Sequence, residues 1–328
     1  MAPRLHKRFA SSSYDQPHTP EQRDPLTHPR YLLPGRTYLV TRRCADRRFY
    51  LKPSSQLRNA FLTCLARASE RYAIEIHAFC VLSNHFHVVL TDASYSPKLP
   101  LFMAALNREL AKFLNTLYRR SGAIWDSGKY SAVHLPSEAE VLDKIVYTIM
   151  NPVAAGLVAT PEEWPGLLTL PADLARRRYR PRCPQLYFRS LASEAPRPSM
   201  KLSRPPSFSG SSNREYRQRV RKAVRARLEE LELTRERAPL GARAVLEQSP
   251  FEQPTPKPPA RRLNPRLAHR GQDKWRRIEL LQALVSFRKR YREAWQRWAK
   301  GFRDVLFPAG TYGMRELHAV RCGPAPPS

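Results

Sequence analysis

The stretch CVLSNHFHVVLTD, residues 80–92, decides the fold because it contains parts of two β-strands and the turn between them. Ser83 and Asn84 are a turn signal, so we expect a hairpin whose second strand begins at His85. Successive side chains of a strand point to opposite faces. His85 and His87 therefore share one face, while Phe86 points into the core behind them. A strand that places two imidazoles side by side raises the question of what they bind.

The segments around the hairpin predict an α+β fold. Besides the hairpin, the expected strands and helices cover residues 38–41, 54–72, 101–122, 123–125, 129–135 and 137–150. The main elements follow the order of a ferredoxin-like βαββαβ unit with one added C-terminal helix. We expect an antiparallel sheet with helices on one face, which would leave the other face free for chemistry and for a ligand.

Two sequence signals mark the limits of the added helix. Ser137 precedes it and Glu140 follows three residues later, which is the pattern of a capping box. Asn151-Pro152 should end it, because proline disfavours a helical residue before it. Earlier in the chain, Ser54 and Ser55 are candidate N-caps of the helix over 54–72.

Composition divides the chain into four parts. The 31 prolines cluster, which indicates linkers rather than one compact unit. We expect a disordered basic tail over 1–29, a sheet domain over 30–172 and a Ser/Pro-rich linker over 173–212. A basic, mostly helical extension follows over 213–328, with a Pro-rich break near 249–265.

The net charge of +29 points to nucleic acid as the partner, because basic residues placed near phosphates release counterions. The charge is spread along the chain, with 29 basic and 12 acidic residues in 201–328, so both halves should meet phosphate. A basic surface that is merely solvated is the alternative.

The sequence also bears on the compartment of the protein. The five cysteines form no CxxC pair, no apolar run would span a bilayer, and the N-terminus lacks a signal-peptide core. We expect no membrane association and a reducing compartment.

The helix over 137–150 offers partners for the two histidines. Its apolar stripe contains Ile145 and Ile149, and Tyr147 falls on the other side of the helix. Asn151 follows one turn after Tyr147 and projects from the same side. If this helix lies beside the histidine strand, two imidazoles, an amide oxygen and a phenol come together. A His-x-His pair alone is more often half-exposed surface histidine than a ligand pair.

This set has a chemical logic in phosphoryl transfer. Mg²⁺ or Mn²⁺ held by His85, His87 and Asn151 would polarise a phosphate. The Tyr147 hydroxyl would attack the phosphorus and displace a 3′-hydroxyl, leaving a covalent 5′-phosphotyrosine that a second 3′-hydroxyl could resolve. Tyr130 is a rival nucleophile, although its apolar neighbours favour packing or base stacking. We expect His77 to be structural and His134 to stabilise a loop or approach phosphate.

Several motifs together resemble a known family. VLSNHFHVVL, followed by YTIMNPVAAGLVATPEEWP, resembles the REP-associated tyrosine transposases, which are single-tyrosine transposases of the HUH endonuclease superfamily. The resemblance covers about residues 30–166. It implies a metal-dependent endonuclease and strand transferase that acts on single-stranded or hairpin DNA. It also implies that Tyr147 is the nucleophile and that His85 and His87 are ligands, with Asn151 as a third. A cytoplasmic, nucleoid-associated bacterial protein is implied as well.

The chain departs from the family pattern at Leu39, where a histidine is usual, and in GLLTL after the EEWP motif. Both departures bear on how the DNA ends would dock.

Two other function classes remain open: a DNA- or RNA-binding protein that keeps the fold without catalysis, and a replication-initiator relative. A histidine-triad hydrolase is rejected because Val89 stands where its third histidine would be. The sequence leaves open a monomer or a homodimer.

Basic and aromatic residues suggest where DNA would run. The candidate phosphate contacts flank the sheet and helix edges: Arg42, Arg43, Lys112, Arg119, Arg120 and Lys129. The aromatic residues of the extension alternate with Arg and Lys: Trp275, Phe287, Tyr291, Trp295 and Trp298. They could stack on bases, but attachment of the helix to the rest of the protein is the favoured role.

Overall fold

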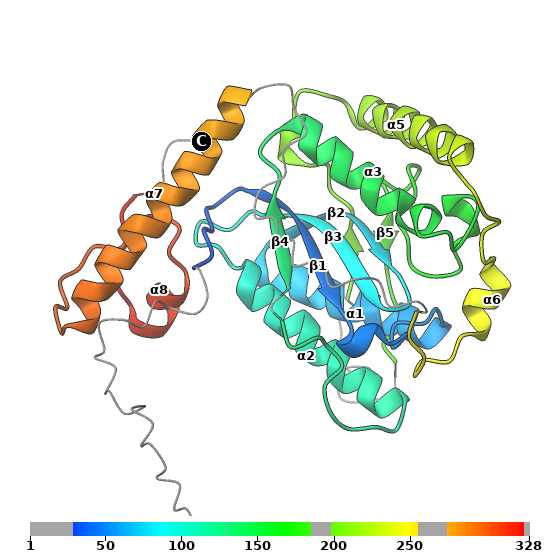
Figure 1. Ribbon diagram of the computed structural model, residues 1–328, viewed down its shortest axis with the longest axis horizontal. Helices are drawn as coiled ribbons and strands as arrows, with labels where there is room; N and C mark the ends of the chain where they lie inside the picture. The colour runs from blue at the N-terminus through cyan, green and yellow to red at the C-terminus, as the bar shows by residue number, and fades with distance from the viewer. Residues whose placement is uncertain (1–28, 129, 185–197, 255–273, 325–328) are drawn as a thin grey trace, which may run out of the picture.

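The computed structural model describes residues 29–128, 130–184, 198–254 and 274–324 (Figure 1). The predicted N-terminal tail, apart from residue 29, and Lys129 lie outside the described residues. The strands are β1 (Thr37–Arg43), β2 (Ile74–Val81), β3 (His85–Asp92), β4 (Ser131–His134), β5 (Arg178–Tyr179) and β6 (Met200–Lys201). The α-helices are α1 (Ser55–Tyr72), α2 (Leu99–Leu117), α3 (Glu138–Ala154), α5 (Asn213–Leu233), α6 (Ala242–Glu247), α7 (Lys274–Ala299) and α8 (Gly313–His318).

The main sheet has the order β2-β3-β1-β4, and every neighbouring pair is antiparallel. With the element order β1-α1-β2-β3-α2-β4, this is the predicted βαββαβ arrangement. The predicted hairpin is present, and its turn closes through the N–H of Leu82, which donates to the His85 carbonyl at 2.9 Å. The predicted α+β class is confirmed.

Both faces of the sheet are covered by helices (Figure 1). On one face, α1 and α2 bury a core that includes Phe61 and Phe86. On the other face, α3 and α5 bury a second core that includes Val89, Ile145 and Tyr216. The prediction that one face is free is therefore wrong. His85 and His87 lie at one end of this second face, where β3 begins, and they are not part of its apolar core.

Local signals at helix ends are confirmed in part. The Ser54 side chain caps α1 by accepting the Leu57 N–H at 3.1 Å. The capping box at Ser137 is absent, because the Ser137 hydroxyl donates to the Glu140 carboxylate instead of accepting a backbone N–H. Helix α3 also continues through Pro152 and ends at Ala154. Gly156, with φ +67, follows in the left-handed conformation that commonly terminates helices.

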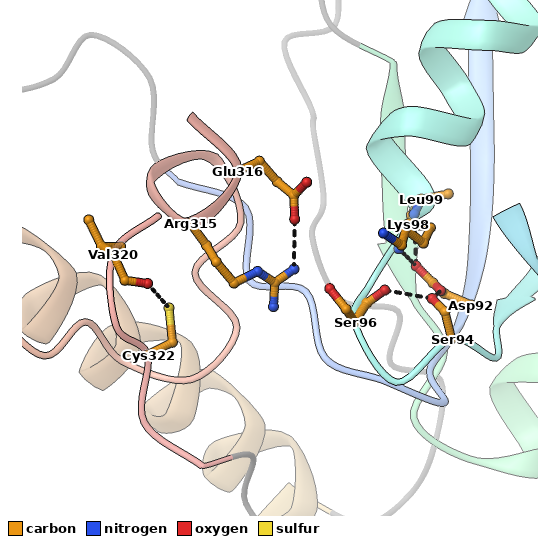
Figure 2. A network of polar contacts seen from close by, with 9 residues as sticks. All are labelled: Asp92, Ser94, Ser96, Lys98, Leu99, Arg315, Glu316, Val320 and Cys322. Carbon is orange, nitrogen blue, oxygen red and sulfur yellow. Dashed lines mark hydrogen bonds and ion pairs between the residues drawn. The ribbon is translucent and has the colours of Figure 1, made fainter. Parts of the chain in front are cut away.

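A buried carboxylate joins β3 to α2. Asp92 is the last residue of β3, and its Oδ2 accepts the N–H groups of Lys98 at 2.7 Å and Leu99 at 2.8 Å (Figure 2). Negative charge at a helix N-terminus is favourable because the first N–H groups have no partner within the helix. This contact fixes the start of α2 relative to the sheet.

The described part of the predicted linker is not an exposed connection. Leu174 belongs to the core under α3, and Tyr179 and Leu202 belong to the core under α1. Tyr179 belongs to β5, which pairs with β6 in a small antiparallel sheet, and Leu202 directly follows β6. Part of the Pro-rich break, residues 255–265, lies outside the described residues. The division into domains stays a prediction.

The predicted helical extension has two parts that contact the sheet domain differently. Helix α5 packs on α3 through apolar side chains that include Val220 and Val224. Helices α7 and α8 share a small core of their own around Phe307. The ring of Phe287 on α7 stacks on Tyr31, with centroids 4.6 Å apart. This contact agrees with the favoured role of the aromatic residues in attaching α7. Across the described ranges, no helix is long and apolar enough to cross a membrane.

Candidate functional site

The two histidines occupy one face at the start of β3, as predicted. Their ring centroids are 4.8 Å apart. Phe86 between them points to the opposite face, where its ring packs edge-on against Phe61 and Trp125. The alternation of the strand thus places an apolar anchor behind the imidazoles, and this anchor is fully buried.

Each imidazole is oriented by a hydrogen bond to its Nδ1 atom. The Asn84 Oδ1 lies 2.6 Å from Nδ1 of His85, and the Thr41 Oγ1 lies 2.7 Å from Nδ1 of His87. An amide oxygen only accepts, so Nδ1 of His85 donates and its Nε2 keeps a lone pair. Nε2 of His87 is buried and has no hydrogen-bond partner among the described residues. Both Nε2 atoms are therefore available to a ligand.

The environment keeps both imidazoles neutral. Burial, followed by the charges of Arg43 and Arg47, lowers the pKa of His85 to about 4. Burial, followed by neighbouring His85 and Arg43, holds the pKa of His87 well below its usual value. A neutral imidazole is the form that coordinates metal ions, so the site is in its ligating form at neutral pH.

Tyr147 lies on α3 beside the histidines. Its ring centroid is 5.2 Å from that of His87, and 42% of the residue is exposed. Burial raises the pKa of the Tyr147 phenol, while a hydrogen bond with Asn151 and the charge of Arg43 lower it. Nζ of Lys144 lies 5.5 Å from the Tyr147 ring centroid. The helix thus presents a partly accessible phenol next to two imidazoles.

The residues present fit a divalent metal ion. The unpaired, buried Nε2 of His87 is the observation that supports this, because such donors and acceptors are normally satisfied. No group of three or more His, Cys, Asp or Glu side chains that could hold a metal occurs in the part of the chain that the structure describes. A site here would therefore need His85, His87, the Asn151 amide and oxygen atoms from a substrate or water.

The predicted phosphate contacts are not gathered at the site. Arg43, opposite His85 on the neighbouring strand, is the member beside it. Arg42 points to the other face, where its guanidinium donates to the carbonyls of Asp126 and Gly128. The remaining described members lie on α2 or just after its end: Lys112, Arg119 and Arg120. Arg120 is engaged locally, with its guanidinium 4.6 Å from the Tyr50 ring centroid.

The other histidine and tyrosine candidates have structural surroundings. His77 is fully buried, and its two ring nitrogens lie 2.8 Å from the Thr91 hydroxyl and 3.0 Å from the Ser203 carbonyl. The guanidinium of Arg30 covers the Tyr130 ring at 3.6 Å, and burial raises the pKa of Tyr130 to about 12. These contacts match the structural role expected for His77 and the packing role favoured for Tyr130.

Sequence reasoning missed three residues that shape the site. Asn84 served only as a turn signal, although it immediately precedes His85. Lys144 stands three residues before Tyr147 on one helix, a spacing that indicates a shared side. Thr41 gives no local signal, because its place opposite His87 depends on the register between β1 and β3.

The fold and the site together define a mixed α+β protein with a histidine pair and a tyrosine at one end of an antiparallel sheet. No family model matches the chain. A REP-associated tyrosine transposase of Haemophilus influenzae is 25% identical over 117 residues, which is 33% of this chain. The match spans 65% of the length of that curated relative. The resemblance predicted from the sequence is confirmed by this relative.

Two solved structures are also similar. One is a REP-associated tyrosine transposase bound to a REP hairpin, with 23% identity and a TM-score of 0.39. The match covers 46% of this chain and 86% of that one. The other is described as a transposase from Deinococcus radiodurans, with 16% identity and a TM-score of 0.27. That match covers 33% of this chain and 85% of the other.

Proposed function

We propose that the protein is a DNA endonuclease and strand transferase of the REP-associated tyrosine transposase type. The observation that carries this proposal is the position of two neighbouring imidazoles beside the partly exposed phenol of Tyr147. The Nε2 atom of His87 is buried and has no hydrogen-bond partner among the described residues. Single-stranded or hairpin DNA is the substrate class that the resemblance implies. The high positive charge supports a polyanionic partner.

Tyr147 is the proposed nucleophile. Its Oη attacks the scissile phosphorus in line, the bond from phosphorus to the 3′-oxygen breaks, and the 3′-hydroxyl leaves. The phenol proton passes to solvent, the departing 3′-oxygen takes a proton from solvent, and a 5′-phosphotyrosine remains. A second 3′-hydroxyl reverses the reaction and rejoins the strand, so no nucleotide hydrolysis is needed. Burial raises the pKa of the Tyr147 phenol, and the Asn151 hydrogen bond and the charge of Arg43 oppose part of this rise.

His85, His87 and Asn151 would hold Mg²⁺ or Mn²⁺. When bound, the ion would polarise the phosphate and neutralise part of its charge. The Thr41 and Asn84 side chains orient the two imidazoles so that their Nε2 atoms stay available. Exposed basic residues of α5, which packs on the helix that carries Tyr147, offer a path for the DNA backbone: Arg214, Arg219, Arg221, Lys222 and Arg225.

Cleavage of a labelled hairpin tests this proposal. The oligonucleotide is taken from repeats that flank the gene and incubated with the full chain, with Mn²⁺ or with a chelator. We expect a covalent band on a denaturing gel that needs Mn²⁺ and is absent from Tyr147→Phe. Tyr130→Phe is the matched control and should keep the band. Binding without any covalent band on several flanking repeats would instead indicate a DNA-binding protein that keeps the fold.

A further inference from the structure

A cavity with a mainly apolar wall and a few charged or polar groups lies at the other end of β1 from the histidines. It has a volume of about 60 Å³ and is enclosed by residues before β1, by β1 and β4, and by one side of α7. Helix α7 lies beside this edge of the sheet domain (Figure 1). Tyr38 lines the cavity, whereas Thr41 and Arg43 at the histidine end of β1 do not. None of the proposed catalytic or metal-binding residues is in its wall.

Three side chains in the wall carry buried polar atoms without a partner among the described residues. They are Nη1 of Arg30, Oη of Tyr38 and Nε of Arg288. Folded proteins leave few buried donors unpaired, and a bound ion is one of the usual reasons for a group of them. Three unpaired donors around one cavity point to a ligand that accepts hydrogen bonds.

The wall is also strongly positive. Arg30, Arg36 and Arg288 contribute three guanidinium groups, and no described residue in the wall is acidic. None of the three forms an ion pair within the described part of the chain. The nearby carboxylate of Asp92 is close enough for its charge to affect the Tyr38 hydroxyl. It already accepts hydrogen bonds from the Ser94 hydroxyl and from N–H groups at the start of α2 (Figure 2). The ligand that would balance this wall is an anion.

Two of the three arginines, Arg30 and Arg36, are held in place by other contacts. Nη2 of Arg30 donates to the Tyr130 carbonyl at 3.0 Å, and its guanidinium carbon lies 3.6 Å from the Tyr130 ring centroid. The Arg36 guanidinium lies 4.9 Å from the Tyr31 ring centroid. Preorganised guanidinium groups suit phosphate, which can accept two parallel hydrogen bonds from one arginine.

We propose that this cavity is a phosphate-binding site that joins α7 to the sheet domain. Its volume is several times the ~10–15 Å³ that one ordered water needs. A phosphate group would accept from Arg30, which precedes β1, from Arg288 on α7, and from the Tyr38 hydroxyl. It would also cancel the repulsion among the three arginines. The phosphate comes either from a DNA backbone or from free phosphate, and the proposal does not depend on nuclease activity.

Calorimetric titration of the full, metal-free chain with inorganic phosphate in chloride buffer tests the site. We expect saturable binding that Arg288→Gln weakens by about tenfold or more, since charge-assisted hydrogen bonds are lost. Arg290→Gln removes a neighbouring exposed arginine of α7 and should leave the affinity unchanged. Tyr38→Phe keeps the ring that packs in the core and removes only the unpaired hydroxyl, so it should weaken binding with an unchanged fold.

A second arm distinguishes the two sources of phosphate. Binding of a single-stranded oligonucleotide is measured without divalent metal over a range of salt concentrations. If the ligand is a DNA phosphate, Arg288→Gln lowers the affinity and reduces the salt slope by about one, whereas Arg290→Gln does not. If only inorganic phosphate responds, the site takes free phosphate. The proposal is overturned if Arg288→Gln and Arg290→Gln behave alike in both arms, or if neither ligand binds saturably.

Discussion

Replacing Thr41 with valine should weaken the divalent-metal site without removing a ligand. The Thr41 Oγ1 lies 2.7 Å from Nδ1 of His87, within hydrogen-bonding distance. Valine has nearly the same shape, so the strand and its packing should persist. The substitution leaves the His87 ring without the side-chain contact that fixes its direction.

The size of the effect follows from the burial of His87. Loss of such an outer partner typically weakens metal affinity by about 10- to 100-fold, or about 1.4–2.7 kcal/mol. His87 is only 4% exposed, so water cannot readily take the place of the lost hydroxyl. We therefore expect the upper half of this range for Thr41→Val.

The assay is Mn²⁺ titration of the full chain, followed by the electron paramagnetic resonance signal of free Mn²⁺. Thr37→Val is the matched control, because it removes a buried hydroxyl from the same strand. Thr37 Oγ1 lies 2.7 Å from the Thr91 Oγ1 and touches neither His85 nor His87. Both variants should lose about 1 kcal/mol of folding stability, and only Thr41→Val should lose Mn²⁺ affinity. Equal Mn²⁺ affinity in the two variants would refute the reasoning.

Three further predictions follow from the same contacts. Asn151→Ala should weaken Mn²⁺ binding by about tenfold, whereas Asn151→Asp should retain it. An unchanged Mn²⁺ affinity in Asn151→Ala would show that Asn151 is not a ligand. The metal-free protein should lose stability as the pH falls from 6.5 towards about 4, because His77 and His85 have pKa values lowered by burial and bind protons more readily when unfolded. Urea titrations across this range check it, and a flat profile would contradict it. Tyr216→Ala on α5 should cost about 3–5 kcal/mol in urea unfolding, and exposed Tyr95→Ala should cost almost nothing; equal values would show that α5 is not part of the core.

Local patterns were sufficient to predict the centre of the site. Strand alternation placed His85 and His87 on one face and Phe86 in the core, and the structure agrees. Helical spacing separated Tyr147 from the apolar stripe of α3, and the structure leaves it partly exposed beside His87. These features depend on neighbours within one element, which the sequence shows directly.

Features that depend on contacts between elements could not be predicted in the same way. The pairing of β1 with β3 decides that Arg43 lies beside His85 while Arg42 faces the other side. The sequence predicts α5 only as part of a basic helical extension, whereas its apolar residues at a spacing of four bury against α3. The face that was predicted to be free is covered by α3, which packs on β2 and β3, and α5 in turn packs on α3. Proline-rich composition likewise concealed that Leu202 is fully buried.

Mass spectrometry of the covalent DNA adduct tests the central claim most directly. After reaction with hairpin DNA and Mn²⁺, nuclease and trypsin digestion should separate the two candidate nucleophiles. Cleavage after Lys129, Lys144 and Arg176 gives one peptide whose sole tyrosine is Tyr130 and another whose sole tyrosine is Tyr147. We predict a nucleotide phosphate on the peptide that starts at Ile145. An adduct on the Tyr130 peptide would contradict the assignment of Tyr147 as the nucleophile. Cleavage of the DNA without any covalent adduct on the protein would contradict it as well.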